Sequence, residues 1–281
     1  MQNFILTLRC PDGPGITHAI TGALLSFGAN ILEQAQFTEP TENLFCNRTR
    51  FETDIDDIAS VREAIEAATS HLSPTITLRN VRDPRRILVM VSKQDHCLVD
   101  LLYRRQQGEL HVEIPVIVSN HPDCAPIAAA HGIPFVHLPV TPDTKPAQEQ
   151  RVRELMQEYS IDAVVLARYM QVLSDDLCAD LEGRAINIHH SFLPGFKGAR
   201  PYHQAYARGV KIIGATAHFV SAELDEGPII EQDVARVTHA QDAEDLAEIG
   251  RDVERVVLAR AVQLYGADRV MLTGNRTVVF A

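Results

Sequence analysis

Three polar side chains in the second half of the chain could act together on a carbonyl group. Asn187 and His189 lie two residues apart in the apolar run A-I-N-I-H, and Asp225 follows in the turn L-D-E-G-P. Strand side chains alternate between faces, so the amide and the imidazole point the same way. A neutral hydrogen-bond donor, an imidazole and a carboxylate are the groups needed to work on a carbonyl. The spacing therefore predicts an active site at the end of a strand.

The elements around these residues predict an α/β sheet that presents this strand end. From residue 86 onward, apolar runs of strand length alternate with segments of helical spacing, and residues 185–188 form the strand that carries Asn187. Such alternation is typical of a doubly wound α/β fold. Pro194 and Gly195 then stop the apolar run and open a loop, and active sites of open α/β sheets are built at strand ends of this kind.

A smaller domain is predicted ahead of this sheet. Its expected order is βαββαβ, a ferredoxin-like plait, with strands at 4–9, 31–37, 44–51 and 73–78 and helices at 16–27 and 55–70. The polar segment N-V-R-D-P-R contains a proline and separates the two patterns. We therefore expect two domains, residues 1–83 and residues 84–281.

Composition restricts the class of protein. The chain of 281 residues is 46% hydrophobic and 22% charged, which is typical of a globular protein. Its formal net charge of −11 argues against nucleic acid as the main partner, because phosphate contacts need a basic surface. The five cysteines are scattered and form no C-x-x-C pair, and no apolar run is long enough to cross a bilayer. We expect a cytoplasmic protein with no membrane contact, no disulfide framework and no metal.

Two motifs resemble a known family. The sequence N-I-H-x-S-x-L-P, followed by H-F-V-x-x-x-L-D-x-G-P, is similar to the formyltransferase fold that handles 10-formyltetrahydrofolate. The resemblance implies that Asn187, His189 and Asp225 are the catalytic triad. It also implies that folate is the substrate and that no separate cofactor is needed. Around the triad it implies six substrate-binding residues: Met170, Val172, Leu173, Arg200, His218 and Glu223.

The N-terminal module distinguishes between members of this family. The loop D-G-P-G-I and the segment G-A-N-I resemble an ACT domain, a fold that often binds amino acids. The segment V-S-K-Q-D-H-C after the first strand of the larger domain lacks the glycine-rich phosphate loop of the ribonucleotide-formylating members. An ACT module joined to a formyltransferase fold is similar to the deformylase members. In these, water replaces the amine acceptor and 10-formyltetrahydrofolate yields tetrahydrofolate and formate.

One substitution departs from the family pattern. After Met170 the wider family often has an arginine in the folate-binding loop, and this chain has Gln171. Relatives hold the pterin largely through backbone groups of this loop, so we expect altered recognition of the folate tail and no loss of folate binding.

Three alternatives are weighed against hydrolysis. The chain could transfer the formyl group to an amine, or act as a non-catalytic amino-acid sensor, for which an intact triad would have no use. A zinc hydrolase is disfavoured because no H-E-x-x-H motif is present and because adjacent strand residues such as His189 and His190 face opposite ways. The residues leave open whether His189 or Asp225 is the primary base.

The ACT resemblance also predicts regulation and assembly. We expect an amino-acid effector to bind at the D-G-P-G loop and at the start of the second strand. ACT domains commonly pair side by side, so we expect a homodimer or homotetramer. The residues that we expect to contact the effector are Asp12, Gly13, Gly15, Asn30 and Ile31.

Overall fold

The computed structural model describes residues 1–55, 57–195 and 201–280, and they form two compact units. The first unit contains residues 1–84 together with the segment that starts at Asp268, and the second contains residues 85–267. The division after Pro84 lies beside the boundary expected from sequence. The C-terminal segment differs from that expectation, because it packs with the first unit and not with the second.

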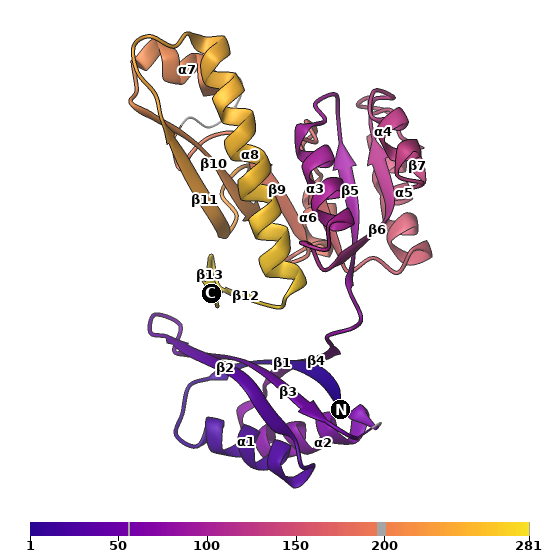
Figure 1. Cartoon of the computed structure of the whole chain (residues 1–281), viewed down its shortest axis with the longest axis vertical. Coiled ribbons are helices and arrows are strands. Elements are labelled where there is room, and N and C mark those ends of the chain that lie inside the picture. The colour runs from indigo at the N-terminus through magenta and orange to yellow at the C-terminus, as the bar shows by residue number, and fades with distance from the viewer. Residues whose placement is uncertain (56, 196–200, 281) are drawn as a thin grey trace. The chain divides into compact units, whose positions relative to one another are not determined.

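The first unit has the predicted βαββαβ order (Figure 1). Its antiparallel sheet has the strand order β2-β3-β1-β4. One sheet face packs on the two helices through a core that includes Leu6, Leu8, Ile20 and Ile65. The elements are β1 (Gln2–Pro11), α1 (Ile16–Ser26), β2 (Asn30–Glu39), β3 (Leu44–Thr53), α2 (Ile58–Thr69), the 3-10 turn η1 (Ser70–Leu72) and β4 (Thr75–Asn80).

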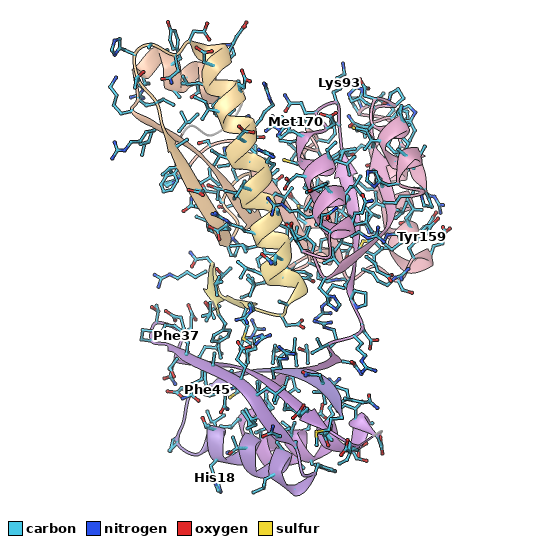
Figure 2. All side chains as sticks on the ribbon, in the orientation of Figure 1. His18, Phe37, Phe45, Lys93, Tyr159 and Met170 are labelled. Carbon is cyan, nitrogen blue, oxygen red and sulfur yellow. The ribbon has the colours of Figure 1, made fainter. Side chains whose placement is uncertain are left out.

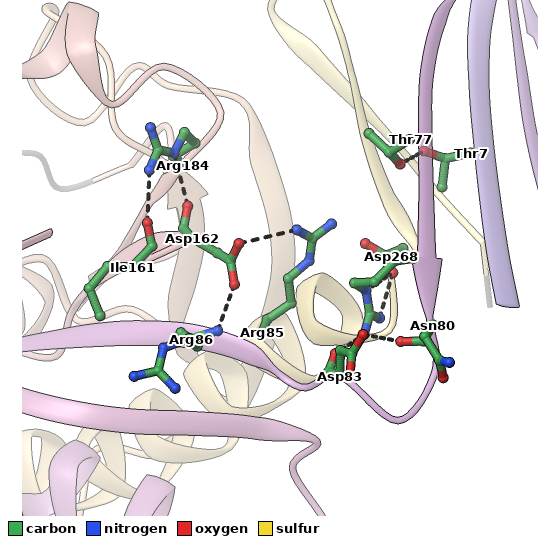
Figure 3. A network of polar contacts seen from close by, with 11 residues as sticks. Thr7, Thr77, Asn80, Asp83, Arg85, Arg86, Ile161, Asp162, Arg184 and Asp268 are labelled. Carbon is green, nitrogen blue, oxygen red and sulfur yellow. Dashed lines mark hydrogen bonds and ion pairs between the residues drawn. The ribbon is translucent and has the colours of Figure 1, made fainter. Parts of the chain in front are cut away.

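A C-terminal hairpin covers part of the first unit. Strands β12 (Val270–Thr273) and β13 (Arg276–Val279) bring Met271, Val278 and Phe280 against Cys46 of β3. Ion pairs surround this apolar contact, including Arg79 with Asp268 at 2.6 Å and Arg269 with Glu33 at 3.0 Å. Asp268 belongs to the close-up of polar contacts in Figure 3.

The second unit is built on a seven-stranded sheet of order β11-β10-β9-β8-β5-β6-β7. Strands β5 to β9 pair in parallel, and β10 and β11 add an antiparallel edge. The strands are β5 (Arg85–Val91), β6 (Val112–Ser119), β7 (Phe135–His137), β8 (Ala163–Leu166), β9 (Ala185–His189), β10 (Ile212–Phe219) and β11 (Ile229–Arg236).

Helices cover both faces of this sheet. Leu88 and Met90 of β5 pack with α5 and α6 in one core cluster, and their neighbours Ile87 and Val89 are also fully buried. Strands that are buried on both faces form the continuous apolar runs seen in the sequence. The helices are α3 (His96–Gln106), α4 (Ala125–Ala130), α5 (Lys145–Glu158), α6 (Asp175–Asp180), α7 (Pro201–Arg208) and α8 (Ala243–Gly266). Helix α7 was not predicted from the sequence.

The strand order of the sheet reverses at β5, and this reversal indicates where a ligand site is expected. Chain order runs from β5 to β6 and β7 on one side and then returns to β8 and β9 on the other. At the entry to this return, Asp162 accepts a hydrogen bond of 2.7 Å from the Arg86 amide and pairs with Arg85 at 3.5 Å (Figure 3). Ligands of open α/β sheets bind at the carboxyl ends of the strands beside such a reversal.

Lys93 and Met170 follow β5 and β8 and lie at the same end of this sheet (Figure 2). No helix in the described part of the chain is long and apolar enough to cross a membrane.

Candidate active site

A cavity of about 290 Å³ lies beyond the carboxyl ends of β8 and β9. The loop after β8, the end of β9, one residue of β10 and the turn before β11 form its walls. Its lining combines aliphatic side chains with a small polar group, as ligand pockets usually do. The polar side chains of the lining are Arg168, Tyr169, Gln171, Asn187, His189, His190, His218, Ser221 and Asp225.

Asp225 is brought to the cavity by a tight turn. Its own backbone has a φ of 59°, in the left-handed region that few residues other than glycine adopt. Gly227 follows, and a Cβ at this position would lie 1.7 Å from the carbonyl oxygen of Phe219. The turn therefore needs glycine at 227 so that the chain can pass close to the end of β10 and direct Asp225 inward.

His189 and Asp225 form a buried pair. His189 Nδ1 lies 3.3 Å from Asp225 Oδ1, and the two side chains are 4% and 9% exposed. Burial by itself would raise the pKa of Asp225, but the hydrogen bond from His189 and the nearby imidazoles outweigh it and lower that pKa. The ionised carboxylate can only accept, so Nδ1 of His189 carries the proton. His189 Nε2 is buried and has no hydrogen-bond partner among the described residues.

His218 fixes the orientation of Asn187. His218 Nδ1 lies 2.8 Å from the carbonyl oxygen of Phe219, which can only accept, so Nδ1 carries the proton. Burial, the main cause, lowers the pKa of His218 and keeps the ring neutral, which leaves Nε2 as an acceptor. The Asn187 amide nitrogen lies 3.2 Å from that Nε2 and donates to it. This bond fixes the orientation of the Asn187 amide in the cavity lining and leaves its second N–H for a ligand.

The loop after β8 supplies the apolar wall. Met170 and Val172 are 56% and 58% exposed, whereas Leu173 is buried. The Met170 amide donates to Ser92 Oγ at 2.9 Å, which ties this loop to the end of β5. The wall therefore has a fixed backbone and exposed apolar side chains that a flat aromatic ligand could cover.

Helix α5 holds the far end of this loop. Glu149 is buried and accepts hydrogen bonds from the amide of Ser174, at 2.8 Å, and from its hydroxyl. Ser174 in turn caps α6 by accepting from the Leu177 amide at 3.2 Å. Gln148 Nε2 donates to the Tyr169 hydroxyl at 3.2 Å. These bonds fix both ends of the cavity wall from a neighbouring helix.

Comparison with known proteins identifies the family. The formyl transferase family profile matches residues 85–262. A formyltetrahydrofolate deformylase of Synechocystis is 48% identical over 287 residues, which covers 100% of both chains. A crystal structure of a formyltetrahydrofolate deformylase from Burkholderia mallei has a TM-score of 0.96 at 49% identity and covers 100% of both chains. The chain belongs to the formyltetrahydrofolate deformylase family.

A more distant relative matches a smaller part of this chain. A glycinamide ribonucleotide transformylase from Symbiobacterium toebii has a TM-score of 0.66 at 30% identity and covers 70% of this chain and 94% of its own. The predicted fold class is confirmed, with a formyltransferase Rossmann-like domain and an N-terminal sheet and helix pair that fits an ACT domain.

One cluster at this cavity, which includes Arg168, was not predicted from the sequence. Glu254 of α8 is 1% exposed, and its carboxylate lies 3.3 Å from Arg168 Nε, 2.9 Å from His96 Nε2 and 2.6 Å from the Tyr202 hydroxyl. Burial would raise the pKa of Glu254, but the bond from His96, the charge of Arg168 and the bond from Tyr202 lower it. Gly250, one turn earlier, makes room for the Tyr202 ring.

The sequence does contain a signal for this cluster. Leu246, Gly250, Glu254 and Leu258 follow one another at intervals of four, so the carboxylate falls on the buried stripe of α8. A charged residue on such a stripe needs a buried partner of opposite charge. That partner, Arg168, directly follows a fully apolar strand.

His96, Cys97 and Glu254 place ligand atoms within 4.8 Å of one another, as a metal site requires. Arg168 is a cation 3.3 Å from the same carboxylate and opposes a second positive charge. Both Glu254 oxygens are also engaged in hydrogen bonds, to His96 and Tyr202. We therefore interpret the group as a charge cluster and not as a metal centre.

The structure brings together most of the residues predicted for the site. Asn187, His189, Asp225 and His218 line the cavity, as do Met170, Val172 and Leu173. Glu223 is exposed in the turn before Asp225 and is not among the lining residues that the structure describes. Arg200 lies outside the described residues. Ser191 donates its hydroxyl to the Gly195 carbonyl and so stabilises the loop after β9.

The residues assigned to an effector are not gathered within one chain. Pro11, next to Asp12 and its loop, pairs with Leu44 at the start of β3, whereas Asn30 pairs with Glu52 near its end. At about 3.4 Å per residue, eight strand positions separate these groups by about 27 Å. The five residues therefore form two separate places on this unit, a loop at one end and a strand start at the other.

Proposed function

We propose that this protein hydrolyses 10-formyltetrahydrofolate to tetrahydrofolate and formate. The observation that carries the proposal is the cavity in which His189 Nε2 is buried without a described partner while Nδ1 is paired with Asp225. The full-length similarity to proteins named formyltetrahydrofolate deformylase supports the same reaction. Folate is the substrate, and the reaction requires no separate cofactor.

In the proposed mechanism each triad residue has one role. Asn187 donates its free N–H to the formyl oxygen as negative charge develops there, and one such donor typically lowers a barrier by about 3–4 kcal/mol. His189 accepts a proton from the attacking water at Nε2 and returns it to the departing folate nitrogen. Asp225 stays ionised, holds the imidazole by Nδ1 and stabilises it when it is protonated.

The geometry favours His189 as the base that meets the substrate. Asp225 accepts the Nδ1 proton, and the same carboxylate oxygen lies 4.0 Å from His218 Nε2. A lowered pKa makes Asp225 a weak base near neutral pH. We therefore assign proton transfer to His189 and orientation and charge balance to Asp225.

The folate site proposed here uses the wall after β8. Met170, Val172 and Leu173 offer an apolar surface, and Leu224 faces the same cavity from the Asp225 turn. We assign the pterin ring to this wall. We keep Arg200 and Glu223 as proposed substrate contacts.

The ACT-like first unit and the cysteines are the basis for proposals about regulation and location. We propose that an amino acid binds the N-terminal unit and that this needs a second chain, because one chain keeps Asp12 and Asn30 at opposite ends of β3. A homodimer or homotetramer would bring the two places together. All five cysteines are free and buried, which suits a reducing cytoplasm where formate could be supplied for purine synthesis.

The test uses purified full-length protein and 10-formyltetrahydrofolate without an amine acceptor. We expect equal amounts of tetrahydrofolate and formate from the wild type and a loss of about 10²–10⁴-fold in Asp225→Asn. Asp233→Asn is the matched control, because Asp233 forms an exposed ion pair with Arg260 at 2.9 Å. Folate binding without formate release by the wild type would contradict the proposal and indicate a transferase that lacks its acceptor.

A further inference from the structure

Arg168 combines three features that each oppose stability. Its guanidinium is buried, with 8% of the side chain exposed, although charged groups prefer water. Its backbone φ is 64°, in the left-handed region that is unfavourable for a side chain with a Cβ. Its Nη1 is buried without a hydrogen-bond partner among the residues that the structure describes. Strain and unsatisfied donors of this kind cluster at functional sites.

The described residues around Arg168 contact its guanidinium at Nε. Its Nε donates to Gln94 at 2.9 Å and lies 3.3 Å from Glu254. Glu254 is itself fixed by His96 and by Tyr202. The cluster therefore balances the charge of the guanidinium and fixes its position, and it leaves Nη1 free.

Arg168 and His189 line the same cavity, and each has one buried nitrogen without a described partner. His190 is close to His189 and is influenced by the charge of Arg168. Its ring centroid is 5.2 Å from that of His189, and burial, followed by the charge of Arg168, lowers its pKa to about 3. His190 is therefore neutral near pH 7. Arg168 supplies the described lining with a permanent positive charge, because a guanidinium does not lose its proton in proteins.

We propose that Arg168 binds the oxygen that water adds to the formyl carbon, and that it holds the formate anion before release. This inference rests on the proposed hydrolysis and names the residue that recognises its product. Guanidinium presents donors in a planar fork that matches the two oxygens of a carboxylate. Asn187 would contact the original formyl oxygen, and Arg168 the new one.

The atoms exchanged in the reaction explain why this role of Arg168 fits attack by water and not attack by an amine. A bond forms between the water oxygen and the formyl carbon, and the bond from that carbon to the folate nitrogen breaks. One proton of the water ends on the folate nitrogen. The other is released, because formic acid is ionised near neutral pH, and the product is an anion with two equivalent oxygens. Attack by an amine would leave only the original formyl oxygen, which Asn187 contacts, and Arg168 would have no new oxygen to bind.

The test measures binding of sodium formate to the wild-type enzyme with tetrahydrofolate present, by calorimetry and by product inhibition. We expect formate to bind and to inhibit. In Arg168→Gln we expect the Kd of formate to rise by about tenfold or more, while the Kd of tetrahydrofolate changes by less than about threefold. A purely structural role would weaken the binding of both ligands together.

Two further variants complete the design. Arg168→Lys keeps a positive charge beside Glu254 but lacks the fork, so we expect a folded protein with intermediate formate affinity. Arg153→Gln is the matched control, since Arg153 pairs with the exposed Asp180 at 2.6 Å. Wild type that hydrolyses the substrate but binds no formate overturns the inference, as does unchanged formate affinity in both Arg168 variants. Wild type without hydrolysis overturns the proposed function instead.

Discussion

The turn that presents Asp225 leaves no space for a methyl group at Gly227. A Cβ at this position would lie 1.7 Å from the Phe219 carbonyl oxygen, whereas ordinary contacts begin near 3.4 Å. In Gly227→Ala the turn must therefore retreat from β10 by up to about 1.7 Å, the difference between these distances. A misplacement of about 1 Å at a catalytic group can cost about 100-fold in rate. We expect kcat to fall by at least that factor.

The assay is formate release at saturating 10-formyltetrahydrofolate, with thermal unfolding measured in parallel. KM should change little, because the loop from Tyr169 to Leu173 is fixed by α5 and by Ser92 and not by the turn. Gly214→Ala is the matched control. Its Cβ would lie 2.5 Å from the Asp233 carbonyl oxygen in the same strand pair, far along β10 from the turn, so it should lower stability and keep most activity. A folded Gly227→Ala enzyme with kcat within about threefold of wild type would refute the reasoning.

Two other perturbations test the supports of the site. Glu149→Gln removes the carboxylate that accepts hydrogen bonds from Ser174. We expect the free energy of unfolding, measured by urea denaturation, to fall by about 1–3 kcal/mol. We expect the folate KM, measured by steady-state kinetics, to rise. His190 has its pKa lowered to about 3 by burial and then by Arg168, so below about pH 6.5 the unfolded chain binds a proton that the folded protein does not. Stability should therefore decrease as the pH falls from 7 to 5, and His190→Gln should lose about 2 kcal/mol less than wild type over that range in urea titrations; equal losses in both proteins would contradict this assignment.

The common location of Asn187 and His189 could be predicted from sequence because strand geometry is regular. Asn187 and His189 share a face by alternation alone, and the glycine in the L-D-E-G-P motif marks a turn. The hydrogen-bond partners of these side chains could not be predicted from alternation. The bond from Asn187 to His218 depends on the register of β9 against β10, which is set by the whole sheet.

The buried cluster around Glu254 shows the other limit. Its members come from α3, the loop after β8, α7 and α8, segments far apart in the chain. Periodicity places Glu254 on the buried face of α8 but does not name Arg168 as its partner. The sequence analysis placed the C-terminal segment in the larger domain, whereas it packs with the first unit. The sequence of a short strand pair does not indicate which surface the pair will cover. The apolar contact with Cys46 becomes visible only in three dimensions.

The return of the chain to its first unit makes the catalytic domain an insertion. Residues 85–267 are joined to the ferredoxin-like fold at both ends, between β4 and β12. A truncation after residue 267 would not leave the first unit intact, because it would uncover Cys46 and Leu44 and leave Glu33 without Arg269. Excision of the catalytic part instead requires two cuts, and a linker that rejoins Pro84 to Asp268 would preserve both pieces. The unit that contains Asn187, His189 and Asp225 is therefore joined to the small unit at both of its boundaries.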